Sequence, residues 1–163
     1  MADFDYYSPD HIASFTEFVK ETKIPILAIC GAHQLVAIAF GAKLKTLDDR
    51  DLADKRTDRV VEYQYRFVKI VDKSDPIFEG NDDDKSGIWQ EYTTQDDILR
   101  VWQNHGVQVD GVPAGFKLLA TSYLCKNQMM VKHDDGQMIY GVQFHLEKSF
   151  EDWKKNPTRW EHP

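Results

Sequence analysis

Two short segments of the sequence carry residue types that together perform nucleophilic chemistry. Cys30 stands between two apolar runs, and His145 stands two residues before Glu147. A cysteine thiolate is a nucleophile, an imidazole moves protons, and a carboxylate orients the imidazole and stabilises its charged form. These residue types predict a catalytic triad of Cys30, His145 and Glu147.

The elements around Cys30 favour a reactive thiolate. The run 24–29 predicts a strand that is covered on both faces, and the run 35–40 predicts a buried helix that ends at Gly41. A cysteine at a strand-to-helix turn is exposed above the sheet edge, and the positive end of the helix favours the thiolate. We expect the backbone N–H of Gly31 to lie where an oxyanion accepts a hydrogen bond.

The second segment places a base at the end of another strand. The pattern at 138–144 predicts a strand that ends just before His145. Cys30 and His145 are far apart in the sequence, but two neighbouring parallel strands would bring their carboxyl ends together, where parallel α/β sheets place their sites.

The remaining elements follow from capping residues and periodicity. A helix is predicted from Ser8, which can act as its N-cap, to about Thr22, and a charged surface excursion is predicted at 46–59. Further strands are predicted at 60–63, 65–71, 98–102, 116–120 and 128–132. The tail at 150–160 is predicted to be a short helix followed by a loose end.

Composition excludes several classes of function. The net charge of −7 argues against nucleic-acid binding, and no apolar run is long enough to span a membrane. Two cysteines do not make a disulfide framework, so with no signal peptide visible we expect a cytoplasmic location. The aspartates at 82–84 lack the spacing of a calcium loop, so no metal site is predicted. Cys125 is interpreted as a core or surface thiol, and His33 as a packing residue.

Three segments, in this order, resemble the class I glutamine amidotransferases. They read IPILAICGAHQLVAIAFGAKL, VWQNHGVQVDGVPAGFKLLATS and IYGVQFHLEKS, and the resemblance extends from about Ile24 to Ser149. It implies an α/β fold of three layers, a mixed and largely parallel flavodoxin-like sheet with flanking helices, within a single domain over residues 1–163. It implies no cofactor.

The resemblance also implies a reaction. Cys30 would attack the side-chain amide of glutamine, His145 would protonate the leaving ammonia, and Glu147 would hold His145. Glutamate and ammonia would form through a γ-glutamyl thioester, and the ammonia would pass to a synthase partner.

Two further residues receive roles from the same resemblance. Gln34 would lie in the glutamine pocket, and His105 would line that pocket or serve as a structural residue, rather than act as a catalyst.

The chain departs from the family pattern before the elbow. Family members have several strands there, and a Gly-Gly loop that donates the second oxyanion N–H; this sequence has only a predicted helix and no Gly-Gly pair. Ala28 and Ala32 replace the glycines usual on either side of the cysteine. We therefore expect a shortened sheet whose elbow strand is an edge, and a homodimer or a heteromeric assembly.

Two alternative functions remain open on the sequence. The chain could hydrolyse a γ-linked amide other than free glutamine, as a γ-glutamyl hydrolase does. It could instead be an inactive amidotransferase-like subunit that keeps the fold for binding or regulation. The intact triad argues against this inactive form, and the missing Gly-Gly loop argues for it.

Overall fold

The computed structural model describes residues 8–52, 58–79, 89, 92–95, 97–134, 136–148 and 155. The predicted C-terminal helix at 150–160, the aspartates at 82–84 and part of the excursion at 46–59 lie outside the described residues. The helices and strands are α1 (Pro9–Glu21), β1 (Ile26–Ile29), α2 (Gly31–Ala39), β2 (Lys43–Thr46), β3 (Glu62–Ile70), β4 (Thr93–Gln95), β5 (Ile98–His105), β6 (Val107–Asp110), β7 (Lys117–Thr121), β8 (Met129–Asp134) and β9 (Gln137–Val142).

Helix α1 forms where its sequence predicts. Ser8 is the N-cap residue, a proline follows in the first turn, and the helix ends before Thr22. The side chain of Ser8 makes no capping hydrogen bond, so its predicted capping role is not fulfilled by that contact. At the other end, the side-chain amide of Gln137 donates to the carbonyl oxygens of Val19, Lys20 and Thr22. These bonds satisfy acceptors that a helix end leaves without partners, and they tie α1 to the start of β9.

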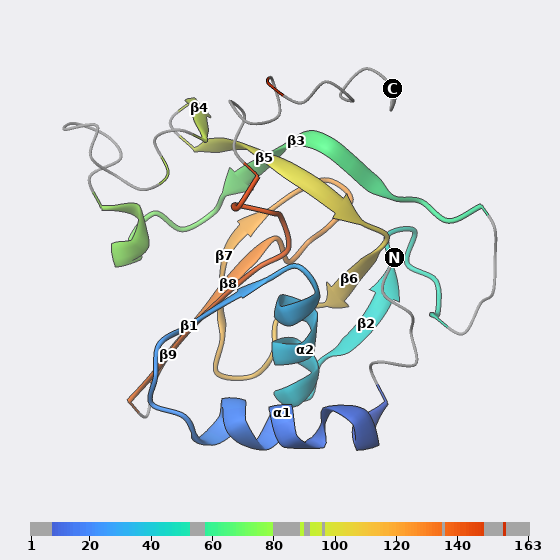
Figure 1. Cartoon of the computed structure of the whole chain (residues 1–163). Helices are drawn as coiled ribbons and strands as arrows, with labels where there is room; N and C mark the ends of the chain where they lie inside the picture. The colour runs from blue at the N-terminus through green and yellow to red at the C-terminus, as the bar shows by residue number, and fades with distance from the viewer. Residues whose placement is uncertain are drawn as a thin grey trace.

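The main sheet has seven strands in the order β1-β9-β8-β7-β3-β5-β4, and β2 pairs with β6 in a separate two-stranded sheet (Figure 1). The α/β class and the mixed sheet are confirmed. The predicted dominance of parallel pairing is wrong for the described strands, because only β1 and β9 run parallel and the other pairs are antiparallel. For β8 and β9 the reason is local: a connection containing Gly136, at φ 72°, joins the two strands, and a hairpin makes neighbours antiparallel. The other antiparallel pairs depend on which strands the tertiary structure brings side by side.

Strand β1 lies at the edge of this sheet. Among the described residues it pairs with β9 alone, over the register from Ile26↔Ile139 to Ile29↔Val142. The prediction that the elbow strand is an edge is therefore confirmed for the part of the chain that is described. Leu27, on this strand, is 52% exposed.

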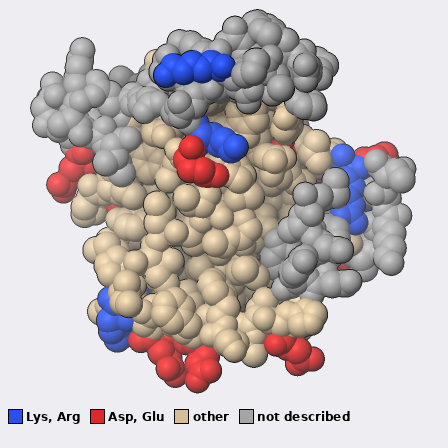
Figure 2. All heavy atoms as spheres, viewed as in Figure 1, with Lys and Arg blue, Asp and Glu red and all other residues tan. Residues whose placement is uncertain are grey.

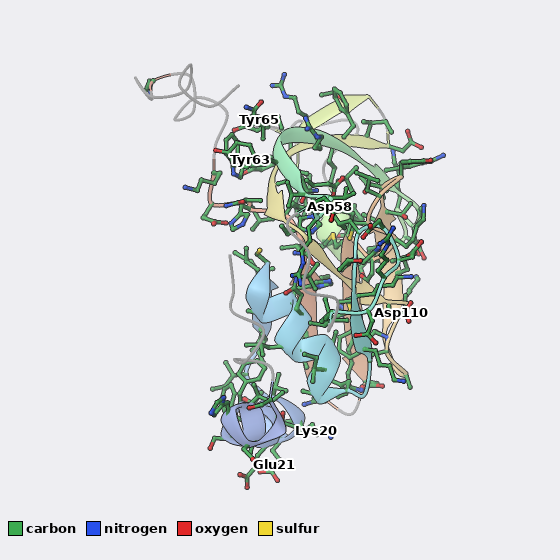
Figure 3. All side chains as sticks on the ribbon, turned by 90° about the vertical axis from the view of Figure 1, so that its right-hand side faces the viewer. Lys20, Glu21, Asp58, Tyr63, Tyr65 and Asp110 are labelled. Atoms are coloured by element: carbon green, nitrogen blue, oxygen red, sulfur yellow. The ribbon has the colours of Figure 1, made fainter. Side chains whose placement is uncertain are left out.

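Two apolar clusters lie on opposite faces of β8 and β9. Successive residues of a strand point to opposite faces: Met130 and Ile139 join the cluster under the helices, whereas Val131 and Tyr140 join the other. Figure 3 shows α2 between α1 and the strands, on one side of the sheet. The sheet curls, and its strands β3 and β5 help to enclose the second cluster (Figure 1).

Several boundaries differ from the sequence expectation. The predicted strands at 60–63 and 65–71 are one strand, β3, which contains Gln64 at φ 68°. Strands β2, β4 and β6 were not predicted; they have only three or four residues each, so their alternation is too brief to stand out.

The surface over the helices is unevenly charged. On the face in Figure 2, acidic side chains gather along the rim that α1 occupies in Figure 1, and the surface above it is largely uncharged. Asp10, Glu17 and Glu21 are the exposed carboxylates of α1. None of the helices in the described ranges is both long and apolar enough to cross a membrane.

Candidate active site

Cys30 occupies a strained turn between β1 and α2. Its backbone has φ 51° and ψ −107°, a conformation that residues other than glycine rarely adopt. Such strain costs about 1–3 kcal/mol and persists where the surrounding structure fixes it. Here the N–H of Cys30 donates to the carbonyl oxygen of Val142 (2.8 Å), and its carbonyl oxygen accepts from the N–H of Gln34 (3.2 Å). The predicted strand-to-helix position of the cysteine is confirmed.

Gly31 is the first residue of α2. The N–H groups of the first helical turn have no acceptor within the helix. The N–H of Gly31 is therefore a free helix-end donor at this turn in the sense of helix geometry, and its role toward an oxyanion stays a prediction.

His145 lies just beyond β9, beside the end of β1. The parallel pairing of Ile29 with Val142 brings the two strand ends together, as predicted from the sequence. The N–H of His145 also donates to the carbonyl oxygen of Trp102 on β5 (2.9 Å). The indole of Trp102 packs edge-on between the rings of Tyr63 and Tyr65, which Figure 3 places on β3. The backbone of His145 is thus fixed from two sides.

Glu147 orients the imidazole. Its Oε1 lies 2.6 Å from Nδ1 of His145, whose side chain is 19% exposed, whereas that of Glu147 is 50% exposed. The turn that carries both residues is held by Tyr92, whose hydroxyl donates to the carbonyl oxygen of Leu146 (2.8 Å).

The thiol of Cys30 and the carboxylate of Glu147 favour a protonated His145. A side-chain hydrogen-bonding interaction with Cys30 is the largest cause that raises the pKa of His145, to about 8; Glu147 adds to it, and burial opposes it. Nε2 of His145 is buried and has no partner that meets strict hydrogen-bond geometry. The contact with Cys30 is therefore long or poorly aligned, as catalytic contacts without substrate often are.

Gln34 does not present a free amide to an open pocket. Its side chain is buried at 4% exposure. Its Nε2 donates to the carbonyl oxygen of Val107 (3.1 Å) and to Oε1 of Gln143 (3.0 Å). Gln143 in turn donates from Nε2 to Sγ of Cys30 (3.7 Å). Sequence reasoning missed Gln143, although it lies only two residues before His145 and directly after β9.

His105 belongs to a buried polar cluster. Its Nε2 lies 2.9 Å from Oε2 of Glu62, with both side chains at most 5% exposed, and its Nδ1 lies 2.9 Å from the carbonyl oxygen of Val107. Glu62 also accepts from Gln128, which bonds to Gln103. Nδ1 of His105 thus has a backbone partner, whereas Nε2 lies at ion-pair distance from Glu62 without meeting hydrogen-bond geometry. The role of His105 in the glutamine pocket stays a prediction.

His33 is a packing residue, as predicted. It is fully buried, and burial lowers its pKa to about 3, so the ring is neutral. The ring lies against Gly141 of β9: a Cβ on that glycine would be 2.6 Å from Nδ1 of His33. Gly141 is therefore required by the close approach of α2 to β9, a requirement that the sequence did not reveal.

Cys125 has none of the features of a reactive thiol. It is fully buried, and burial is the largest cause that raises the pKa of its thiol. Nor do the described residues contain a cluster of three or more His, Cys, Asp or Glu side chains that would hold a metal ion.

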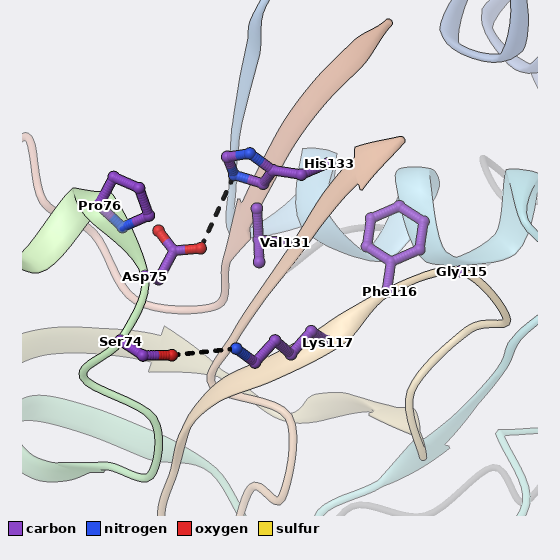
Figure 4. A pocket seen from close by; sticks show the side chains of 8 residues that line it. All are labelled: Ser74, Asp75, Pro76, Gly115, Phe116, Lys117, Val131 and His133. Carbon is purple, nitrogen blue, oxygen red and sulfur yellow. Dashed lines mark hydrogen bonds and ion pairs between the residues drawn. The ribbon is translucent and has the colours of Figure 1, made fainter. Parts of the chain in front are cut away.

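A cavity of about 400 Å³ lies at the opposite end of the strands (Figure 4). His133 on β8 pairs with Met138 near the start of β9, whereas the candidate active site lies beyond the end of β9. Within the cavity wall Asp75 accepts a hydrogen bond from Tyr140 (2.7 Å), and its other oxygen is 3.7 Å from Nε2 of His133. These contacts hold the segment around Asp75 against the sheet.

The family of the chain follows from comparison with known proteins. The model of the family described as glutamine amidotransferase class-I matches residues 6–162. The chain belongs to the class I glutamine amidotransferases. Solved structures agree in fold: a Thermotoga maritima glutamine amidotransferase has a TM-score of 0.64 at 23% identity, covering 98% of this chain and 56% of that one. A Thermoplasma acidophilum protein described as a GMP synthase component has 0.61 at 24%, covering 85% and 56%.

Curated relatives bear a more specific name. One of the subunits of the glutamine-hydrolysing GMP synthase of Thermococcus kodakarensis is 35% identical over 88% of this chain and 61% of its own length. The corresponding protein of Methanothermobacter thermautotrophicus is 33% identical over 80% of this chain and 55% of its own length. This amidotransferase chain therefore spans little more than half the length of these two relatives.

The elbow of this family member forms without the glycines usual at two positions. Ala28 is buried at 2% exposure in the cluster under the helices, and Ala32 packs partly buried against the same cluster. The strained angle falls on Cys30 itself, so neither alanine needs a positive φ. The structure offers no replacement for the Gly-Gly pair: among the described residues, β1 and the elbow are preceded by α1 and by no strand.

Proposed function

We propose that this chain hydrolyses the side-chain amide of glutamine to glutamate and ammonia, with Cys30 as the nucleophile. The observation that carries the proposal is the position of Cys30 on the strained elbow beside His145, whose Nδ1 lies 2.6 Å from Glu147. An activated nucleophile, a base and a group that orients the base are the parts that covalent amide hydrolysis needs.

The reaction proceeds in two steps, formation of a thioester and its hydrolysis. The Cys30 thiolate forms a C–S bond to the amide carbon, and the N–H of Gly31 donates to the oxyanion. The C–N bond then breaks, and protonated His145 gives its proton to the leaving nitrogen, which departs as ammonia. In the second step neutral His145 takes a proton from water, the hydroxide attacks the thioester carbon, and the C–S bond breaks to release glutamate and the thiolate.

We further propose that the ammonia is used by a synthase component in the same assembly. The relatives from Thermococcus kodakarensis and Methanothermobacter thermautotrophicus are named as subunits of glutamine-hydrolysing GMP synthases. Amination of a nucleotide is therefore the acceptor chemistry that these relatives favour. Among the described residues β1 pairs with β9 alone, and its other edge is where an assembly partner, or a second copy of the chain, would pair.

The inactive subunit is the second candidate. Within the described residues the N–H of Gly31 is the oxyanion donor assigned above, and a second donor is not assigned. Removal of one such donor costs about 10²–10³ in rate. A γ-glutamyl compound other than glutamine is an alternative substrate, because the described contacts assign no residue that would recognise the part of the substrate beyond the reacting amide.

The test is release of both products by the purified chain. We expect equal amounts of glutamate and ammonia from glutamine, loss of turnover in His145→Ala, and a smaller loss in Glu147→Gln, since that change weakens orientation and charge stabilisation but leaves the imidazole in place. Cys125→Ala is the matched control and should retain turnover. If no product forms from glutamine or from γ-glutamyl amides, alone or with the synthase component added, the inactive subunit is the correct interpretation.

A further inference from the structure

The side chain of Gln143 contacts the nucleophile, and the two reaction steps above give it no role. It is fully buried, and its Nε2 lies 3.7 Å from Sγ of Cys30, within hydrogen-bond range for sulfur. Its backbone N–H donates to the carbonyl oxygen of Gln128 (2.9 Å). A buried amide with a fixed backbone holds its side chain in few orientations.

A chain of hydrogen bonds decides which end of the Gln143 amide faces the sulfur. The carbonyl oxygen of Val107 only accepts hydrogen bonds, so the atom of Gln34 that lies 3.1 Å from it must be the donor Nε2. The same Nε2 also lies 3.0 Å from the Gln143 amide, which must therefore present its oxygen, Oε1, to Gln34. The NH₂ group of Gln143 is left facing Cys30. The network assigns this orientation, which side-chain shape alone would leave ambiguous.

The network joins four elements around the thiol. Val107 begins β6, Gln34 lies in the first turns of α2, Gln143 follows β9, and Cys30 follows β1. An N–H that donates to an ionised sulfur is a charge-assisted hydrogen bond, and such bonds are stronger than neutral ones. The contact therefore favours the state in which Cys30 is ready to attack.

We propose that Gln143 is a catalytic residue that donates an N–H to the Cys30 thiolate, and that Gln34 is a positioning residue that holds the Gln143 amide in the donating orientation. The proposal rests on the proposed function in that Cys30 is the nucleophile of that reaction. It replaces the glutamine-binding role that the sequence predicts for Gln34.

The experiment measures the rate at which iodoacetamide alkylates Cys30 as a function of pH, in the full chain and without glutamine. In Gln143→Met, which keeps the side-chain length but removes the donor, the midpoint of the rate-versus-pH curve should move up by about one pH unit, as expected for loss of a hydrogen bond to a charged group. In Gln34→Met the midpoint should move the same way by less, because the Gln143 amide remains but is free to turn.

The matched control is Gln137→Met, which alters a buried glutamine at the other end of β9. It removes three hydrogen bonds to the end of α1, so its melting temperature should fall while the alkylation midpoint stays at the wild-type value. This separates a loss of stability from a change at the thiol. If Gln143→Met does not fold, Gln34→Met carries the test.

The outcomes separate this proposal from the proposed function. An unchanged midpoint in Gln143→Met overturns the catalytic role of Gln143, even if the wild-type chain hydrolyses glutamine. An increase in KM for glutamine in Gln34→Met, without any change in the alkylation midpoint, overturns the positioning role and restores the substrate-binding one. A wild-type chain without glutaminase activity contradicts the proposed function and leaves the alkylation comparison valid.

Discussion

The backbone N–H of Cys30 donates to the carbonyl oxygen of Val142 (2.8 Å). Val142 lies three residues before His145 in the sequence. This bond continues the parallel pairing of β1 with β9 by one residue past the end of β1. It fixes the strained elbow to β9, the strand that precedes His145. Cys30 and His145 are therefore positioned by one backbone ladder, although 114 residues of sequence lie between them.

Selective labelling checks the assignment of the nucleophile. A diazoketone analogue of glutamine should modify Cys30 and spare Cys125, because Cys125 is fully buried and its pKa is raised chiefly by burial. Mass spectrometry of peptides from the labelled chain measures both sites. The Cys30→Ala variant should take up no label, and modification of Cys125 at a comparable rate would count against the mechanism.

Titration of His145 checks the electrostatics of the site. The ring signals of His145 in NMR spectra should titrate with a pKa of about 8, above its ordinary value of 6.5. Cys30→Ala should lower this pKa most and Glu147→Gln should lower it less, because the contact with Cys30 is the largest cause that raises it. A larger decrease of the pKa in Glu147→Gln than in Cys30→Ala would contradict the assignment of Cys30 as the main cause of the raised pKa.

The raised pKa of His145 also has a consequence for stability. The folded state binds the proton of His145 more tightly than the unfolded state does. The stabilisation is therefore fully present below pH 6.5 and is lost as the pH rises through about 8. The difference in the free energy of unfolding between the wild type and His145→Ala, measured by urea denaturation, should therefore decrease as the pH rises from 6.5 through about 8.

His33 should make the protein sensitive to acid. Burial lowers the pKa of this histidine to about 3, so between that pH and 6.5 the unfolded state binds a proton that the folded state does not. The stabilisation is present above pH 6.5 and declines as the pH falls toward 3. Urea denaturation at several pH values should show a shallower decline for His33→Leu than for the wild type.

The wild type measured at the same pH values is the reference for that series. Equal declines in His33→Leu and the wild type would show that His33 does not bind an additional proton on unfolding.

Gly141→Ala should destabilise the fold. The new Cβ would lie 2.6 Å from Nδ1 of His33 and 3.2 Å from Cε of Met130. Because His33 is fully buried and cannot move aside freely, we expect a loss of about 1–3 kcal/mol in the free energy of unfolding. Denaturant titration measures it.

A second glycine gives the matched control. A Cβ on Gly31 would meet nothing within 4 Å, and alanine is a better helix former than glycine, so Gly31→Ala should not lower the stability. A Gly141→Ala variant as stable as the wild type would show that the contact with His33 imposes no constraint.

The positions of Cys30 and His145 at the ends of their strands could be predicted from the sequence. The apolar run that ends at Cys30 and the strand that ends at His145 are both short-range patterns, and each is written in consecutive residues. A carboxylate two residues after the histidine is close enough in the sequence to reach its imidazole, as the 2.6 Å contact between Glu147 and His145 shows. The start of α1 at its serine and proline was predictable for the same reason.

The partners of Gln34, Gln143 and Gly141 were decided only by the tertiary structure. Gln34 binds a carbonyl oxygen 73 residues away and an amide 109 residues away. Gly141 is needed because a ring on α2 packs against it. The antiparallel majority of the sheet likewise depends on which strands become neighbours. A buried polar group must find a partner wherever the packed chain brings one, and sequence spacing carries no record of contacts between elements that meet only on folding.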